Sequence, residues 1–172
     1  MSNDHAGYGN PTIKGTVLDN ARVNHDAYVG PAATVKENAY ICDDAFIREE
    51  AIVKGNAEIR ESATIKGNAI IDGDARVGGH IIVGYNARIG GKASLHGEGY
   101  FGGFAEITSD NDYVIIQGLT STPLTIYKSS AWGIEVATVL QGETPLECFL
   151  ENDNIPQSLR DVVGLIAKKW QK

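Results

Sequence analysis

The chain has 172 residues, a formal net charge of −7 at pH 7, 42% apolar residues, 20 glycines and 5 prolines. This composition is typical of a folded protein with many tight turns and excludes a disordered chain. Acidic residues are in excess and lie between the Lys and Arg residues, which argues against nucleic acid or an anionic membrane as a partner.

Residues 1–14 are predicted to be a lead-in to the first structural repeat. Their polar sequence lacks the basic start and apolar run of a signal peptide, and no segment approaches the ~18 apolar residues of a membrane span. The two cysteines, Cys42 and Cys148, lie far apart and in different predicted units, so a disulfide framework is not expected. We therefore expect a cytoplasmic protein in a reducing compartment.

Residues 15–107 repeat with a period of six. A large apolar residue recurs without loss of phase, and Ala or Gly precedes it by two positions everywhere except at Ile81. Strands of an ordinary sandwich lose such spacing in their variable turns, so the regularity favours a solenoid. The large residues are Val17, Val23, Val29, Val35, Ile41, Ile47, Val53, Ile59, Ile65, Ile71, Val77, Val83, Ile89, Leu95, Phe101 and Ile107.

Six residues make one short strand and one corner, and three such sides complete a coil. Large side chains would fill a triangular interior and stack on their equivalents in coils ~4.8 Å apart. The corners contain residues that tolerate a positive φ, such as Asp19–Asn20 and Gly78–Gly79. The pattern resembles the hexapeptide-repeat family. This resemblance implies a mainly β fold, a left-handed parallel β-helix of about five 18-residue coils.

The residue before each large one faces outward, and these residues form one column on each side of the prism. A single column is apolar or aromatic along most of its length: Tyr28, Phe46, Thr64, Ile82 and Tyr100. A contiguous apolar surface indicates that something covers it. In the hexapeptide-repeat family three β-helices pack with parallel axes, so the resemblance implies a homotrimer with this column in the interface. The alternative is that the chain's own C-terminal helix covers it.

Residues 108–172 are predicted to form a small α+β cap. A polar linker, 108–112, precedes three β-branched runs at 113–116, 124–127 and 134–140, which predict an antiparallel meander. Thr144 as N-cap and Pro145 as first helical residue predict a short helix to about Leu150. A second helix starts at Pro156, and its apolar residues recur at helical spacing up to Trp170. We expect this unit to close the end of the β-helix.

The family includes acyltransferases that use acyl-CoA, and the resemblance implies a His base near a groove between subunits. His25, His80 and His96 fall on one corner of the coil and are the candidates. The simpler interpretation is a solvated corner that accepts polar residues of any kind. Zinc-containing relatives use three His, two of them five residues apart. No pair among the four histidines of this chain has that spacing, so no metal site is expected.

No loop interrupts the repeat, and this favours a non-catalytic, trimeric β-helix scaffold without a cofactor. Such a scaffold would bind another protein or present its terminal unit. The first alternative is a hexapeptide-repeat acyltransferase, with an acyl-CoA donor in the groove between subunits. The second alternative is a virion or surface assembly component.

Overall fold

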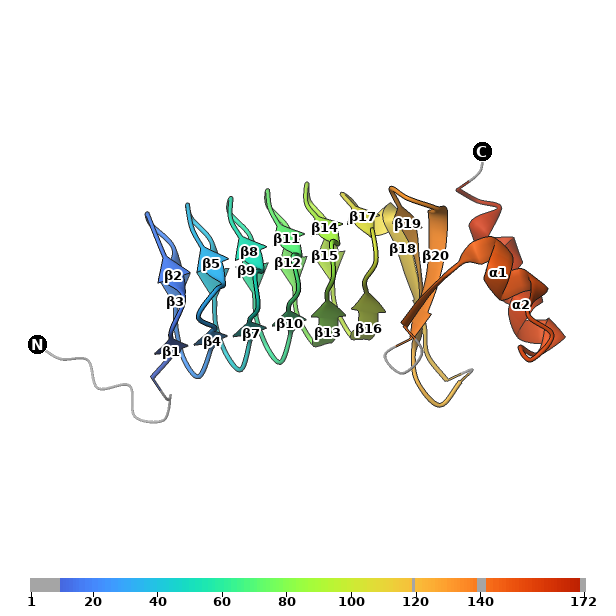
Figure 1. Cartoon of the computed structure of the whole chain (residues 1–172), viewed down its shortest axis with the longest axis horizontal. Helices are drawn as coiled ribbons and strands as arrows, with labels where there is room; N and C mark the ends of the chain where they lie inside the picture. The colour runs from blue at the N-terminus through green and yellow to red at the C-terminus, as the bar shows by residue number, and fades with distance from the viewer. Residues whose placement is uncertain (1–9, 119, 139–141, 171–172) are drawn as a thin grey trace, which may run out of the picture.

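The computed structural model describes residues 10–118, 120–138 and 142–170. Its strands stack into a rod of parallel coils, with a small sheet and two helices at one end (Figure 1). Strands that occupy the same side of successive coils pair in register 18 residues apart, as Tyr28 does with Phe46. The predicted β-helix of about five coils with a C-terminal cap is therefore confirmed. The left-handed winding stays a prediction that comes from the resemblance.

Three parallel sheets form the sides of the prism. Sheet A contains β1 (Thr12–Ile13), β4 (Tyr28–Val29), β7 (Phe46–Ile47), β10 (Thr64–Ile65), β13 (His80–Val83) and β16 (Glu98–Phe101). Sheet B contains β2 (Thr16–Val17), β5 (Thr34–Val35), β8 (Ile52–Val53), β11 (Ile70–Ile71), β14 (Arg88–Ile89) and β17 (Glu106–Ile107). Sheet C contains β3 (Arg22–Val23), β6 (Tyr40–Ile41), β9 (Glu58–Ile59), β12 (Arg76–Val77) and β15 (Ser94–Leu95).

The interior of the prism is the predicted ladder of aliphatic residues. From Val29 onward each large residue of the repeat is at most 1% exposed, whereas Val17 and Val23 in the first coil are half-buried. The pairing begins earlier than the repeat, because β1 lies within residues 1–14 and pairs with β4. Thr12 lies opposite Tyr28, a spacing of 16 residues instead of 18, so β1 is out of phase with the six-residue pattern.

Ile81, the exception to the small-residue rule, is explained by its neighbour in the next coil. Ile81 is fully buried and pairs with Gly99. A Cβ on Gly99 would lie 3.4 Å from Ile81 Cδ1 and 3.0 Å from Thr125 Oγ1 of the cap. The large side chain therefore sits where the next coil carries none, and Gly99 lets the cap approach closely.

The cap is an antiparallel sheet of four strands with two helices behind it: β18 (Tyr113–Ile116), β19 (Leu124–Ser129), β20 (Gly133–Thr138), β21 (Gly142–Pro145), α1 (Leu146–Glu151) and α2 (Gln157–Ala167). A 3₁₀ turn at Asp110–Asp112 links it to the coil. Tyr127 of β19 is fully buried in the same core as the β-helix, with its ring centroid 5.6 Å from that of Phe101. The cap sheet thus closes the last coil.

The other face of the cap sheet packs against the helices. Leu124, Val136, Phe149 of α1 and Val163 of α2 form a separate buried cluster there. The helices lie beyond the sheet at the end of the rod (Figure 1). Because α2 packs in this cluster, it does not cover the apolar column of sheet A.

Two local expectations for the cap need correction. β21 is a fourth strand, in which Thr144 pairs with Val136 and Pro145 with Glu135. The short helix therefore begins at Leu146 with Pro145 as its N-cap, rather than at Pro145 with Thr144 as its N-cap. Proline is compatible with an edge strand, so the antiparallel pairing continues to Pro145. The last two residues of the strand predicted at 134–140 lie outside the described residues.

Candidate functional site

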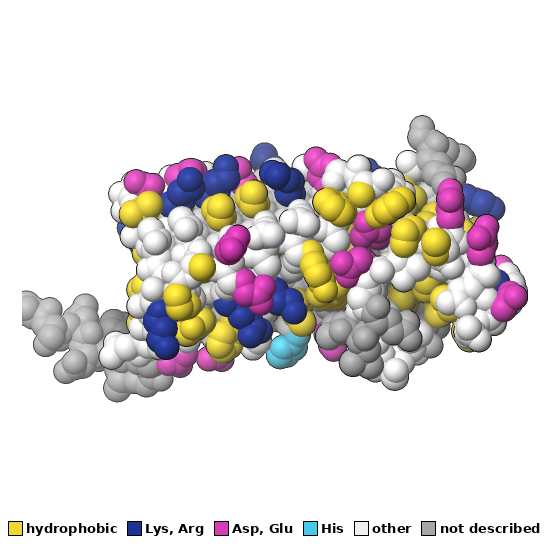
Figure 2. Space-filling model, in the orientation of Figure 1, with side chains coloured by type: hydrophobic (Ala, Val, Ile, Leu, Met, Phe, Trp, Pro, Cys, Tyr) yellow, Lys and Arg dark blue, Asp and Glu magenta, His cyan; other side chains and the backbone are white. Residues whose placement is uncertain are grey.

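The outer face of sheet A carries three columns of residues, because side chains alternate in and out along each side of the coil. The central column is Tyr28, Phe46, Thr64, Ile82 and Tyr100. Two residues earlier in each coil are Asp26, Asp44, Ser62, His80 and Glu98, and two residues later are Gly30, Arg48, Lys66, Gly84 and Gly102. In Figure 2 hydrophobic, acidic and basic side chains all occur along the lower edge, where Figure 1 places the strands of sheet A.

The exposed apolar surface of the central column lies in its first coils and at Ile82. Phe46 is 41% exposed, and its ring centroid lies 5.9 Å from that of Tyr28, which is half-buried like Ile82. Thr64 is 9% exposed and Tyr100 only 6%. The predicted column therefore lies on the outer face of sheet A. Its N-terminal end is exposed at Phe46, and its end near the cap is buried at Tyr100.

Tyr100 is covered by its own chain. Its ring lies over Gly102, where a Cβ would come within 2.7 Å of Tyr100 Cε1. Burial, followed by the nearby carboxylate of Glu143, raises the pKa of the Tyr100 hydroxyl well above its usual value. This end of the column therefore belongs to the junction with the cap.

The two columns that flank the central column differ in charge, and the exposed Glu49 and Glu50 follow Arg48 directly at the corner. We call Asp26, Asp44 and Glu98 the acidic edge, and Arg48 and Lys66 the basic edge. The acidic side chains and Arg48 are exposed, and Lys66 is half-buried. The sequence alone did not identify either edge as a surface feature. These residues lie at or beside corners, where any polar residue is tolerated.

The three candidate histidines share a corner but occupy different sides of it. His80 is exposed and opens β13 on sheet A, where it pairs with Glu98. His96 follows β15 on the sheet C side, is 64% exposed, and places Nδ1 3.6 Å from Glu61 Oε2. His25 is half-buried at the corner itself, with φ of 59°. The strand register therefore places His80 opposite Glu98, whereas the imidazole of His96 lies beside Glu61.

The corner cysteine is an unreactive group in this setting. Cys42 is 6% exposed, and burial, followed by the neighbouring carboxylate of Asp43, raises the pKa of its thiol to about 11. The thiolate is the nucleophilic form, so Cys42 is poorly suited to covalent chemistry at neutral pH. Cys148 in α1 is a free and exposed cysteine.

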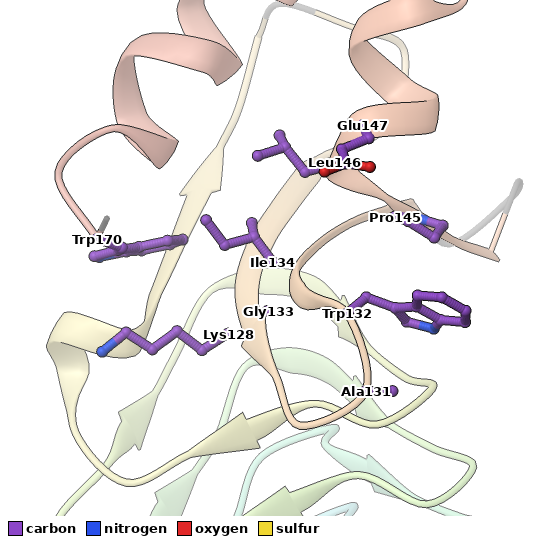
Figure 3. Close-up of a pocket in the computed structure, with 9 residues that line it drawn as sticks. All are labelled: Lys128, Ala131, Trp132, Gly133, Ile134, Pro145, Leu146, Glu147 and Trp170. Atoms are coloured by element: carbon purple, nitrogen blue, oxygen red, sulfur yellow. The ribbon is translucent and has the colours of Figure 1, made fainter. Parts of the chain in front are cut away.

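A cleft of about 480 Å³ lies in the cap, where no site was predicted. Figure 3 shows Ile134 and Leu146 in its middle, with Trp170 on one side and Trp132 on the other. Trp132 is 64% exposed. The polar lining includes Glu147 and the Lys128 ammonium, which already binds Asp112 at 2.6 Å. This lining is suited to binding an apolar or aromatic group.

Within residues 10–118, 120–138 and 142–170, neither helix has the length and apolar character required to cross a membrane. In the same described residues, no cluster of three or more His, Cys, Asp or Glu side chains is arranged to hold a metal ion. Comparison of the chain with protein-family models, with curated proteins and with solved structures found no match.

Proposed function

We propose that this protein is a non-catalytic β-helix scaffold of the hexapeptide-repeat type that assembles as a homotrimer through the central column of sheet A. The observation that carries the proposal is the 41% exposure of Phe46 beside Tyr28 and in line with Ile82 on one side of a rigid rod. Exposed apolar columns of this kind are stabilised by burial against a second surface. The cap helices pack elsewhere, so another copy of the chain is the covering surface.

The cap is the end of the scaffold that contacts a protein partner. Its support is Trp132, which is 64% exposed beside the cap cleft. Tryptophan is enriched at protein interfaces because a large apolar ring carries one hydrogen-bond donor. A trimer with its cap helices at the end of the rod would present several copies of this surface together.

The proposal is tested by substitution of Phe46, the most exposed aromatic residue of the central column. Phe46→Glu places a charge in the interface, and we expect the trimer dissociation constant to rise by at least tenfold because a buried, unpaired charge is costly. Sedimentation velocity of the wild type and the variant measures this. The matched control is Ile70→Glu on the outer face of sheet B, which we expect to leave the mass at three times 18.4 kDa. A wild-type mass of one chain would contradict the proposal.

The acyltransferase alternative has one observation in its favour, the approach of His96 to Glu61. A carboxylate beside an imidazole is an arrangement used to orient a general base. Thermal denaturation with coenzyme A and acetyl coenzyme A separates the two functions, because a ligand that binds the folded state raises Tm. A scaffold without an acyl-donor site shows no rise. A saturable rise in Tm that is lost in the His96→Ala variant would contradict the scaffold function and favour an acyltransferase.

A further inference from the structure

The outer face of α2 is an apolar surface that the described part of the chain leaves open. The helix buries Val163 and Ala167 in the cluster behind the cap sheet, and it lies at the end of the rod (Figure 1). Away from this cluster, Val162 is 37% exposed and Leu165 is 64% exposed, more than any other large aliphatic side chain of the described residues. Such exposure on a helix whose inner face is well packed indicates that a second surface covers it.

Gly164 lies beside this apolar face, and the packing of the chain itself does not require a glycine there. A Cβ on Gly164 would meet Leu150 Cδ2 at an ordinary contact distance of 3.8 Å. Glycine destabilises a helix interior relative to alanine, so its presence has a cost. Together with Leu150 and Leu165 it lines a shallow groove of about 480 Å³. The missing side chain lets a neighbouring molecule approach the helix closely.

The charges that line this groove on α2 are self-complementary. Asp161 lies three residues before Gly164, and Lys168 lies three residues after Leu165. Both are exposed, and within the described residues neither forms an ion pair. Asp161 accepts a hydrogen bond from Gln157 Nε2 at 2.8 Å. If two copies pack their α2 helices antiparallel across Gly164 and Leu165, two-fold symmetry places each Asp161 against the Lys168 of the other copy.

The remaining charged residues around α2 favour the same direction. Arg160 lies 3.3 Å from Asp153, which the exposed Glu151 precedes, so acidic groups are in excess at the N-terminal half of α2. Lys169 adds a second cation at the C-terminal end, and Glu147 lines the cap cleft instead of this groove. Antiparallel packing brings opposite charges and opposite helix dipoles together, whereas parallel packing brings like charges together.

We propose that α2 is a self-association surface, through which two copies of this chain pack antiparallel across Gly164 and Leu165 and join two rods cap to cap. The partner is a second copy because one face supplies both the apolar contact and the two charges that pair across it. This contact does not depend on association through sheet A. It is one helix wide, so we expect it to be weak and to form at higher protein concentration than a large interface.

Substitution of Leu165 tests the apolar contact. The full chain with Phe46→Glu serves as the background, because this change removes the association proposed for sheet A. Sedimentation velocity over a concentration series should show a mass that rises from 18.4 kDa toward twice that value. Leu165→Glu should raise the dimer dissociation constant at least tenfold, because it places a carboxylate in the apolar contact. The matched control is Leu18→Glu, an exposed leucine of the first coil, which should leave the constant unchanged.

Exchange of charge tests the ion pairs in the same background. Asp161→Lys and Lys168→Glu should each raise the dissociation constant about tenfold, because like charges then face each other in both contacts of the dimer. An equimolar mixture of these two variants should associate within about threefold of the parent chain, because every mixed pair contains two contacts of opposite charge. The constant of the parent chain should rise with salt.

Disulfide cross-linking tests the direction of the two helices. Cys148→Ser is added to the background, and Cys42 is buried, so the introduced thiols are the accessible ones. A mixture of Asp161→Cys and Lys168→Cys chains should oxidise to mixed dimers, because antiparallel packing places the two positions opposite each other. Identical positions are then ~10 Å apart along the helix axis, beyond the reach of a disulfide.

The outcomes separate this inference from the scaffold proposal. A Phe46→Glu chain that stays single at every concentration, or that associates equally well with Leu165→Glu, overturns the α2 contact and leaves sheet A untouched. Cross-linked dimers of identical chains in place of mixed dimers overturn the antiparallel arrangement. A Phe46→Glu dimer that is lost in Leu165→Glu and restored by mixing the two charge variants supports the inference, whatever the mass of the wild type.

Discussion

Acidic residues at the corners combine an unfavourable backbone conformation with a favourable hydrogen bond. Glu49 has φ of 57°, in the left-handed region where other corners use glycine. Its carboxylate accepts a hydrogen bond at 2.8 Å from the N–H of Gly67, the equivalent corner residue of the next coil. Glu37 and Asp43 make the same contact with Gly55 and Glu61. These side chains therefore join neighbouring coils where the strands do not.

Substitution of Glu49 separates the two effects. Glu49→Ala keeps the left-handed strain and loses the hydrogen bond, so we expect a loss of ~1 kcal/mol in the free energy of unfolding. Glu49→Gly loses the same bond but removes ~1 kcal/mol of strain, so it should lie close to wild type. Urea denaturation measures the free energy of unfolding of the wild type and of the two variants. Equal stability of the Ala and Gly variants would show that strain at this corner is negligible.

At the scale of elements, the 3₁₀ turn at Asp110–Asp112 joins the last coil to the cap through one carboxylate. Asp112 is 6% exposed and accepts hydrogen bonds from the N–H and hydroxyl groups of Thr108 and Ser109 and from the Lys128 ammonium. Burial alone would raise its pKa, but these donors, led by Lys128, lower it to about 2. The ionised form of Asp112 therefore stabilises the junction.

The low pKa of Asp112 predicts the direction in which the free energy of unfolding changes with pH. The stabilisation is present above the unfolded value of 3.8 and is lost as the pH falls toward 2, which removes ~2 kcal/mol. Asp112→Asn should therefore lose less free energy of unfolding between pH 5 and pH 2 than wild type, by ~2 kcal/mol. Urea denaturation across this range measures the difference, with the exposed Asp26→Asn as control. Parallel pH profiles for wild type and Asp112→Asn would contradict this role.

The elements of the coil were predictable and those of the cap only in part. The six-residue period specifies which residue of each coil points inward, because the same position recurs at every turn. β21 was missed because Thr144 and Pro145 also form a good helix start, and only pairing with β20 makes them a strand. β1 was missed because its pairing is displaced by two residues from the repeat. Tertiary contacts decided both cases.

At the scale of the whole molecule, the repeat predicted the central column but not the surfaces around it. Arg48 and Lys66 resemble ordinary corner residues until the pairing aligns them along one edge of sheet A. The cap cleft is lined by Trp132 and Trp170, which are distant in sequence and line the same cleft only when the turn before β20 and the segment after α2 fold together. A six-residue pattern carries no information on such contacts, because they lie outside the repeat or between its columns.

Hydroxyl-radical footprinting of the wild type tests most directly whether copies meet through the outer face of sheet A. In a single chain Phe46 is 41% exposed and Trp132 is 64% exposed, so both would be oxidised readily. In the assembled protein we predict that Phe46 is protected together with Tyr28, whereas Trp132 stays reactive. Dilution below the dissociation constant should restore oxidation of Phe46. Oxidation of Phe46 at the rate of an exposed ring at every protein concentration would contradict the account.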